Sequence, residues 1–225
     1  MKIETVSPIR FEKKWLFKNI FYTELLLSLY RSNFFFKEQH NSRLINSIYF
    51  DTNKLDCIND NLDGVNIRKK FRVRWYGDNR ILNRANLEIK CKKNFESYKK
   101  IIPLKIFKNF DVTKNNNIEL LTQYINRNVL SNVNLKPINL IHYKRLYHIS
   151  SNKLIRATLD YNIKSKKIIN FSNPFFSNFN DVILELKYDT NLDSYVRNNL
   201  KQMNSRYSKS SKYINYTLFP SNNFS

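Results

Sequence analysis

The sequence predicts an α+β fold in which many antiparallel strands are joined by a few helices. Seven segments alternate between polar and apolar residues with a period of two, which is typical of strands. Four further segments have the features of helices. The chain has 225 residues and no linker rich in Pro, Gly or Ser, so we expect one domain over residues 1–219 and a C-terminal tail over residues 220–225.

The helices are expected at residues 18–30, 53–61, 118–130 and 192–203. Three of them carry apolar stripes, for example Leu120, Leu121, Tyr124, Ile125 and Val129 in the third. The second follows Asp51 and Thr52, which we expect to act structurally at a strand-to-helix turn. Residues 170–180, with three phenylalanines, are expected to form a loop.

The strands are expected at residues 9–17, 44–50, 67–76, 86–92, 140–148, 154–161 and 182–188. Because residues i and i+2 of a strand share a face, six of them have a charged or polar face. Those faces are Arg10/Glu12/Lys14, Arg68/Lys70/Arg72/Arg74, Glu88/Lys90/Lys92, Tyr143/Arg145, Arg156/Thr158/Asp160 and Glu185/Lys187. A single such strand is usually a sheet face in water. Six favour a barrel with charges lining its lumen and helices packed outside.

The composition limits the kind of ligand and how it could be bound. Lys and Arg number 39 against 18 Asp and Glu, a net charge of +21 that favours a polyanionic partner. AT-rich coding sequence also produces such a composition, so the placement of the charges is the stronger evidence. Only Gly64 and Gly77 are glycines, which excludes a Gly-rich phosphate loop. Any phosphate would therefore be bound by side chains.

Cys57 and Cys91 are expected to be unpaired thiols in a reducing compartment, because no Cys-x-x-Cys motif occurs and the three histidines are scattered. The sequence has no apolar run of membrane-spanning length, so we expect a soluble, cytoplasmic protein.

The ordered set of short motifs resembles the polyphosphate polymerase domain of the vacuolar transporter chaperone (VTC) family, within the CYTH-like or triphosphate tunnel metalloenzymes. The resemblance covers about residues 8–214. The matching segments are residues 10–14, 47–52, 64, 68–74, 87–90, 143–145, 156–160, 183–187 and 211–213. Each motif alone is weak, whereas their order and spacing together are fairly specific.

The resemblance implies a closed antiparallel eight-stranded β-barrel, the triphosphate tunnel, with helices packed outside. It implies transfer of the γ-phosphoryl group of ATP onto polyphosphate with Mn²⁺ or Mg²⁺. The implied catalytic residues are Arg72, Arg74, Lys90, Arg145, Lys187 and Lys212. The implied substrate-binding residues are Lys14, Lys99 (or Lys100 in its place), Tyr143, Arg156, Lys209 and Ser211, and the implied metal ligand is Glu185.

Two other functions stay open at this stage. A tunnel triphosphatase would use water as the acceptor, but Arg10 stands where such enzymes begin with a glutamate, which leaves fewer acids for metal. A non-enzymatic binder of nucleic acid or polyphosphate could use the aromatic residues beside basic ones in residues 70–76 as a stacking platform. Phe71, Trp75 and Tyr76 are more readily explained as core or barrel exterior. The regulatory inositol-phosphate-sensing domain and the membrane segment of the eukaryotic complexes are not expected in this chain.

Overall fold

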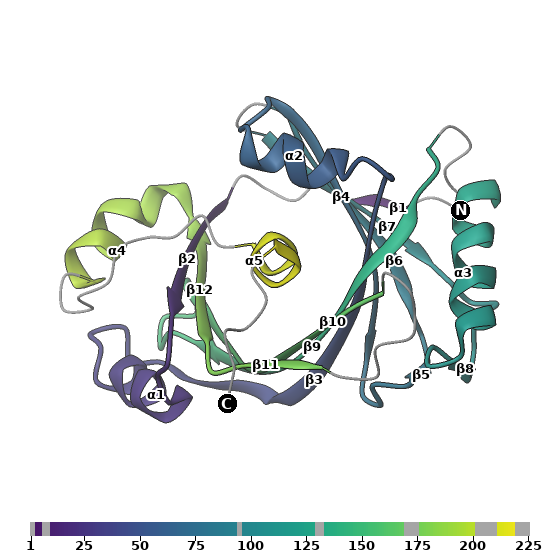
Figure 1. Ribbon diagram of the computed structural model, residues 1–225. Helices are drawn as coiled ribbons and strands as arrows, with labels where there is room; N and C mark the ends of the chain where they lie inside the picture. The colour runs from purple at the N-terminus through teal and green to yellow at the C-terminus, as the bar shows by residue number, and fades with distance from the viewer. Residues whose placement is uncertain are drawn as a thin grey trace.

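The computed structural model describes residues 3–5, 10–93, 96–128, 133–168, 176–200 and 211–218, with the side chains of all except residues 3–5, 10 and 96. The described part is an antiparallel sheet that curves around one short helix, with other helices outside (Figure 1). The predicted α+β class is therefore confirmed.

The described strands form one ten-stranded sheet and one small two-stranded sheet. The order in the large sheet is β1-β7-β6-β4-β3-β9-β10-β12-β2, with β11 paired to β10. Its strands are β1 (Ile3–Thr5), β2 (Arg10–Phe17), β3 (Lys37–Asp51), β4 (Ile67–Tyr76), β6 (Asn86–Lys93), β7 (Glu96–Pro103), β9 (Lys136–Ile149), β10 (Arg156–Lys167), β11 (Ser177–Phe179) and β12 (Val182–Asp189). The small sheet pairs β5 (Ile81–Leu82) with β8 (Phe110–Asp111).

The expected closed eight-stranded barrel is wrong, because the sheet is curved but open. Its edge strands are β1 and β2, and in the described part of the chain no backbone ladder joins β2 to β7 or β1. β1 pairs with residues 99–101 of β7, so another strand occupies this part of the edge. Side chains connect the two ends of the sheet instead, since Lys90 of β6 lies 3.6 Å from Glu12 of β2.

All four expected helices are present, with shorter bounds at some ends. They are α1 (Tyr22–Tyr30), α2 (Asp56–Leu62), α3 (Asn115–Asn128) and α4 (Asp193–Asn199), the last preceded by the 3-10 turn η1 (Thr190–Leu192). A fifth, α5 (Lys212–Leu218), was not expected as a full element. None of the described helices has the length and apolar composition needed to cross a membrane. The expected tail, residues 220–225, lies outside the described residues.

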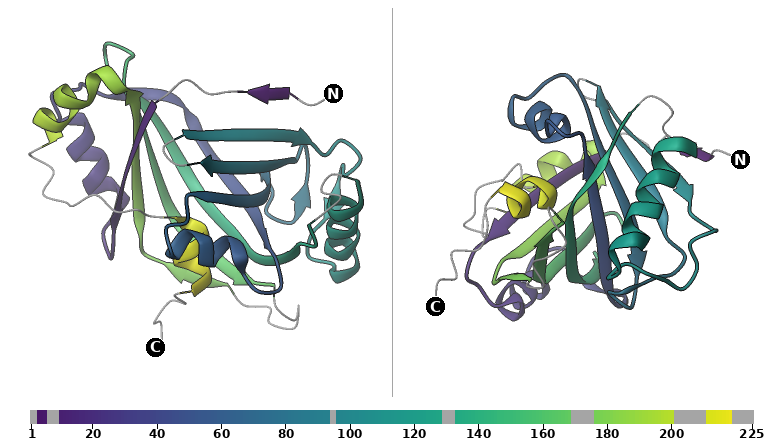
Figure 2. Two further views of the ribbon diagram at one scale, coloured as in Figure 1. Left: turned by 90° about the horizontal axis from the view of Figure 1, so that it is seen from above. Right: turned by 45° about the vertical axis from the view of Figure 1, so that its right-hand side comes forward.

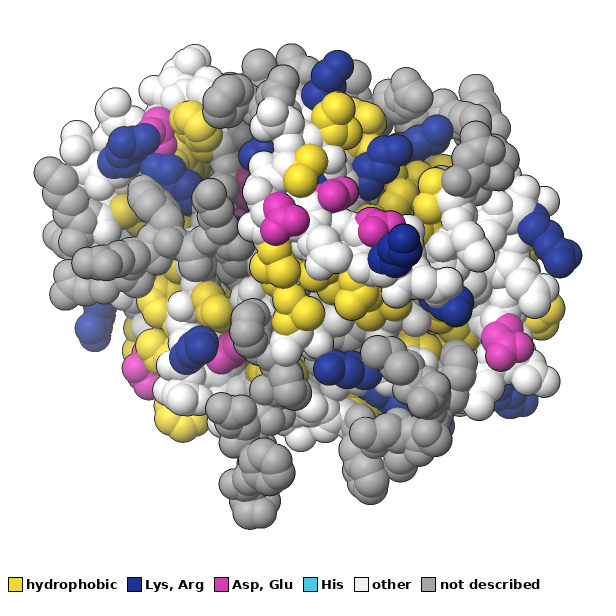
Figure 3. All heavy atoms as spheres, turned by 45° about the horizontal axis from the view of Figure 1, so that its top comes forward, with side chains coloured by type: hydrophobic (Ala, Val, Ile, Leu, Met, Phe, Trp, Pro, Cys, Tyr) yellow, Lys and Arg dark blue, Asp and Glu magenta, His cyan; other side chains and the backbone are white. Residues whose placement is uncertain are grey.

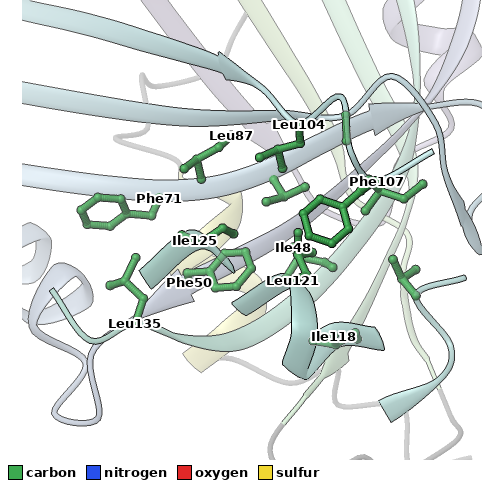
Figure 4. Close-up of a cluster of buried hydrophobic side chains, with 14 of the residues drawn as sticks. Ile48, Phe50, Phe71, Leu87, Leu104, Phe107, Ile118, Leu121, Ile125 and Leu135 are labelled. Atoms are coloured by element: carbon green, nitrogen blue, oxygen red, sulfur yellow. The ribbon is translucent and has the colours of Figure 1, made fainter. Parts of the chain in front are cut away.

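Two hydrophobic clusters pack helices against the outer face of the sheet. The first joins α3 to β3, β4 and β6, and its side chains include Phe50, Phe71, Leu87, Leu121 and Ile125 (Figure 4). Burial of each such side chain contributes roughly 1.5–3 kcal/mol. The second joins α1 and α4 to the other half of the sheet. The apolar faces of the strands are thus buried outward, which leaves their charged faces toward the interior.

α5 lies on the concave side of the sheet, in the space that a closed barrel would enclose (Figures 1 and 2). The Tyr213 ring stacks on Tyr49 of β3 with centroids 4.9 Å apart. The side-chain amide of Asn139 and the hydroxyl of Ser165 both donate to the backbone carbonyl of Tyr216, at 2.8 and 2.9 Å. α5 therefore forms an inner wall of the fold and is anchored to three strands.

Asp51 has the structural role that its place before a helix indicated. Its carboxylate accepts hydrogen bonds from the backbone N–H groups of Cys57 and Ile58 in the first turn of α2, at 2.9 and 3.1 Å. It also accepts a hydrogen bond from the Tyr213 hydroxyl at 2.7 Å. A fully buried carboxylate is stable here because these donors replace water.

We predict that Asp51→Ala lowers the free energy of unfolding by about 2–4 kcal/mol, since it removes a helix cap and a buried charge-assisted hydrogen bond. Chemical denaturation measures the change, with Asp63→Ala at the exposed end of α2 as the control. An Asp51→Ala protein as stable as the control would contradict this role.

Candidate functional site

The inner face of the sheet and α5 enclose a cavity of about 370 Å³, which we call the basic cavity. Its size lies within the usual range for small-ligand pockets, roughly 300–1,000 Å³. It is lined by Glu12, Lys14, Tyr49, Lys70, Arg72, Arg74, Glu88, Lys90, Ser97, Tyr98, Lys99, Tyr143, Arg145, Ile183, Glu185, Lys187, Ser211 and Lys212. Among the described residues, nine Lys or Arg and three Glu side chains line it, a surplus of six positive charges.

Strand register explains why these side chains meet. In the β4–β6 pair, Arg72 lies opposite Glu88 and Lys70 opposite Lys90. In the β2–β12 pair, Lys14 lies opposite Glu185. Directly paired residues of neighbouring strands point to the same face, so each charged face joins the next around the curve of the sheet.

Glu88 of β6 holds three cations from the two strands on either side of it, β4 and β7. Its carboxylate lies 2.5 Å from Arg72, 2.6 Å from Lys99 and 3.8 Å from Arg74. Burial alone would raise the pKa of Glu88, but Arg72, Arg74 and Lys99 lower it to about 2. Glu88 is therefore a carboxylate at neutral pH that fixes the positions of these cations.

Asp160 does not itself line the basic cavity, but it pairs with two more of the lining cations. It is fully buried on β10 and accepts a bidentate hydrogen-bond pair from Arg145 at 2.5 and 2.7 Å. Lys212 of α5 forms an ion pair with the same carboxylate. Burial opposes ionisation, but Arg145 and Lys212 hold the pKa of Asp160 below its usual value. This triad ties β9, β10 and α5 together.

Glu12 and Glu185 share lysines between β2 and β12. Lys187 lies 2.8 Å from Glu185 and 3.9 Å from Glu12, while Lys14 is paired with Glu12 and lies 3.5 Å from Glu185. Lys90 approaches Glu12 from across the open seam of the sheet. Burial would raise the pKa of Glu185, but Lys14, Lys187 and Arg145 hold it well below its usual value.

Glu12 and Glu185 are the side chains best placed to hold a divalent metal ion. The described residues contain no group of three or more His, Cys, Asp or Glu that could do so by themselves. Mg²⁺ commonly binds proteins through one or two carboxylates and completes its shell with water and substrate phosphate oxygens. Two glutamates at a phosphate-sized basic cavity fit that pattern. The sequence indicated Glu185 alone as a ligand, and the structure adds Glu12 as its neighbour.

The structure brings most of the sequence-predicted site residues together. Every one of them lines the basic cavity except Arg156, which is exposed on β10, and Lys209, which lies outside the described residues. Of the alternatives Lys99 and Lys100, Lys99 lines the cavity.

Several cavity residues were absent from the predicted site. Lys70 could have been found, because it belongs to the same alternating run of β4 as Arg72 and Arg74. Tyr49 lines the cavity from β3, where its hydroxyl accepts a hydrogen bond from Arg72 at 3.4 Å, and Ser97 lies on β7, which was not predicted. Tyr49 lies in the matching segment 47–52 but was given no role there, and no local sequence signal marked Ser97.

Among the described residues, the outer face shown in Figure 3 does not repeat the concentration of positive charge found in the basic cavity. On the face shown in Figure 3, Lys and Arg side chains are spread over the described surface, and Asp and Glu side chains gather near its centre. On that face, the described Lys and Arg side chains therefore form no cluster comparable to the basic cavity.

Comparison with known proteins identifies one family. The family model for the VTC domain matches residues 9–219. A search of curated protein sequences found no match.

Solved structures with a similar fold have low sequence identity to this chain. A proposed adenylate cyclase from Bacillus halodurans has 16% identity and a TM-score of 0.55, covering 93% of this chain and 97% of that one. A proposed adenylyl cyclase from Hippeastrum, described as having a dominant triphosphatase activity, has 17% identity and a TM-score of 0.52, covering 92% and 95%. At this identity the likeness establishes the fold.

We predict that Asp160→Asn lowers the free energy of unfolding at pH 7 by about 3–5 kcal/mol, because Arg145 and Lys212 lose a buried partner. The folded pKa of Asp160 is lowered, so its contribution is present above the unfolded value of about 3.9 and is lost as the pH falls through the folded value. The difference from wild type should therefore shrink in acid.

Denaturation at pH 7 and at pH 3 measures both effects. Asp63→Asn, at an exposed position of the same charge, is the control. Equal stability of Asp160→Asn and the control at pH 7 would refute the role of the triad.

Proposed function

Because the chain belongs to the VTC domain family and has the fold of the CYTH-like tunnel proteins, we propose that it is an enzyme acting on triphosphates, specifically a polyphosphate polymerase. In this proposal the basic cavity binds ATP and a polyphosphate chain. The observation that carries it is the convergence of nine Lys and Arg and three Glu side chains of the described residues on one cavity. A polyphosphate loses its hydration on entry, and such a set of charged donors replaces it.

The reaction requires positioning and charge neutralisation more than a protein nucleophile. A terminal oxygen of the polyphosphate attacks the γ-phosphorus of ATP, and a new P–O–P bond forms. The bond between the γ-phosphorus and its bridging oxygen breaks, and ADP leaves with that electron pair. The attacking oxygen is already ionised, so no general base is needed.

The residues of the basic cavity would have different roles in positioning the phosphates and neutralising their charge. Arg72 and Arg74 carry planar guanidinium groups fixed by Glu88, which suits bidentate binding of phosphate oxygens. Arg145 is fixed by Asp160 in the same way. The Tyr143 hydroxyl accepts a hydrogen bond from Arg74 at 3.2 Å and can donate to a phosphate oxygen. Preorganised donors of this kind stabilise the transition state without rearrangement.

Glu12 and Glu185 would hold Mn²⁺ or Mg²⁺ at one side of the cavity, where a bound metal ion neutralises charge that develops on phosphate oxygens. In the described contacts these carboxylates are paired with lysines. A metal ion bound there would compete with Lys14 and Lys187 for the two carboxylates. The same lysines would then bind the substrate.

We predict that the purified protein converts ATP into polyphosphate in the presence of Mn²⁺. Arg72→Ala/Arg74→Ala should lower the rate by at least about 100-fold, because it removes two preorganised charged donors. Arg80→Ala/Arg127→Ala, at two exposed positions, is the matched control. Product length is followed by gel electrophoresis and ADP by a coupled assay.

The same assay separates the competing functions. Release of orthophosphate from tripolyphosphate without chain growth would assign the cavity to a triphosphatase. Salt-sensitive binding of polyanions without turnover of ATP would assign it to a binding protein. Absence of polyphosphate under conditions where ATP binds would overturn the polymerase proposal.

We further predict that Glu185→Gln raises the Mn²⁺ concentration needed for half-maximal activity by at least about tenfold. Binding of tripolyphosphate without metal should stay the same or tighten, because the cavity loses a negative charge. Glu119→Gln, on the exposed face of α3, is the control. An unchanged Mn²⁺ requirement would show that Glu185 does not hold the metal.

A further inference from the structure

One lysine of the basic cavity differs from the other cations there. Four carboxylates, Glu12, Glu88, Asp160 and Glu185, pair with eight of the nine lining Lys and Arg side chains in the described part of the chain. The ninth is Lys70. Within the described residues its ammonium group has one polar partner, the hydroxyl of Ser211 at 3.0 Å.

The groups around Lys70 are themselves cations. They come from its own strand and from two neighbouring elements, and are Arg68 and Arg72 of β4, Lys90 of β6 and Lys14 of β2. Two of these cations, Lys14 and Lys90, pair with Glu12, which is also shared with Lys187. Lys70 is therefore half-buried in a region of uncompensated positive charge.

We propose that Lys70 is a phosphate-binding residue whose missing counter-charge is supplied by the substrate, so that entry of a phosphate chain is accompanied by uptake of a proton. This inference rests on the proposed function, because it requires that the basic cavity binds a phosphate chain. It adds one residue and a proton to that binding step.

The direction of the effect follows from the surroundings. Burial, together with the positive charges of Lys14, Lys90, Arg68 and Arg72, lowers the pKa of Lys70 to about 7. At neutral pH the empty cavity therefore holds this lysine partly uncharged. A phosphate oxygen beside its ammonium group favours the charged form, so binding and protonation strengthen each other.

A permanently charged cation at this position would show no such dependence on pH. With lysine, affinity for a phosphate chain should fall by up to about tenfold for each pH unit above 7.5, until the pH reaches the pKa of the bound form. Below pH 6.5 the lysine is already charged and the effect should disappear.

Isothermal titration calorimetry with tripolyphosphate, in the absence of metal, tests the proposal between pH 6.5 and 9. Wild type is compared with Lys70→Arg, Lys70→Met and the control Lys69→Met, which removes the same charge from the exposed, outward-facing neighbour. Tripolyphosphate titrates in this range too, but identically for every variant, so the comparison with Lys70→Arg isolates the lysine.

We expect the affinity of Lys70→Arg to fall less with pH than that of wild type, and the proton uptake of wild type at pH 8, measured in buffers of different ionisation enthalpy, to exceed that of Lys70→Arg. Lys70→Met should bind more weakly than wild type at pH 6.5 and approach it at pH 9. Identical pH dependence of wild type and Lys70→Arg would overturn the inference. Failure of wild type to bind tripolyphosphate at any pH would instead overturn the proposed function.

Discussion

The constraint on which this fold depends is the repulsion among cations collected in one cavity. Two like charges 4 Å apart repel by about 4 kcal/mol at the effective dielectric of a protein surface, and nine line the basic cavity in the described part of the chain. Four carboxylates offset this repulsion, each shared by two or three cations. Because each carboxylate is shared, few acidic residues are enough to offset the repulsion among the cations. A surplus of positive charge therefore stays available to bind an anion.

Helix α5 completes the lining of the basic cavity. Ser211, which directly precedes α5, and Lys212, its first residue, line the cavity, and Lys212 pairs with the buried Asp160. Tyr213 connects the same helix to Asp51, which in turn caps α2. Segments far apart in the sequence therefore contact one another, and α5 adds one cation to a charged wall that the strands supply. In the described part of the chain, the ion pair between Glu12 of β2 and Lys90 of β6 crosses the open seam of the sheet, where no backbone ladder is formed.

Much of this arrangement could be predicted from the alternation of residues along single strands. The alternating runs located seven strands, and the residues at alternate positions of β4 and β12 do face the cavity. β7 escaped prediction because apolar and polar residues occur on both of its faces, as in Tyr98, Lys99 and Ile101. The closure of the barrel could not be judged from local patterns either, since it depends on whether β1 or β2 pairs with the edge of β7. The pairing of each carboxylate with its cations could not be predicted either, because it depends on the strand register across the sheet.

The central claim is that the basic cavity binds the phosphates that react. A structure determined with a non-hydrolysable ATP analogue and Mn²⁺ tests it most directly. The triphosphate should lie inside the cavity in contact with Arg72, Arg74 and Arg145, and Glu185 should hold the metal ion. An analogue bound elsewhere on the protein, with the lysine–glutamate pairs of the cavity unchanged, would contradict it.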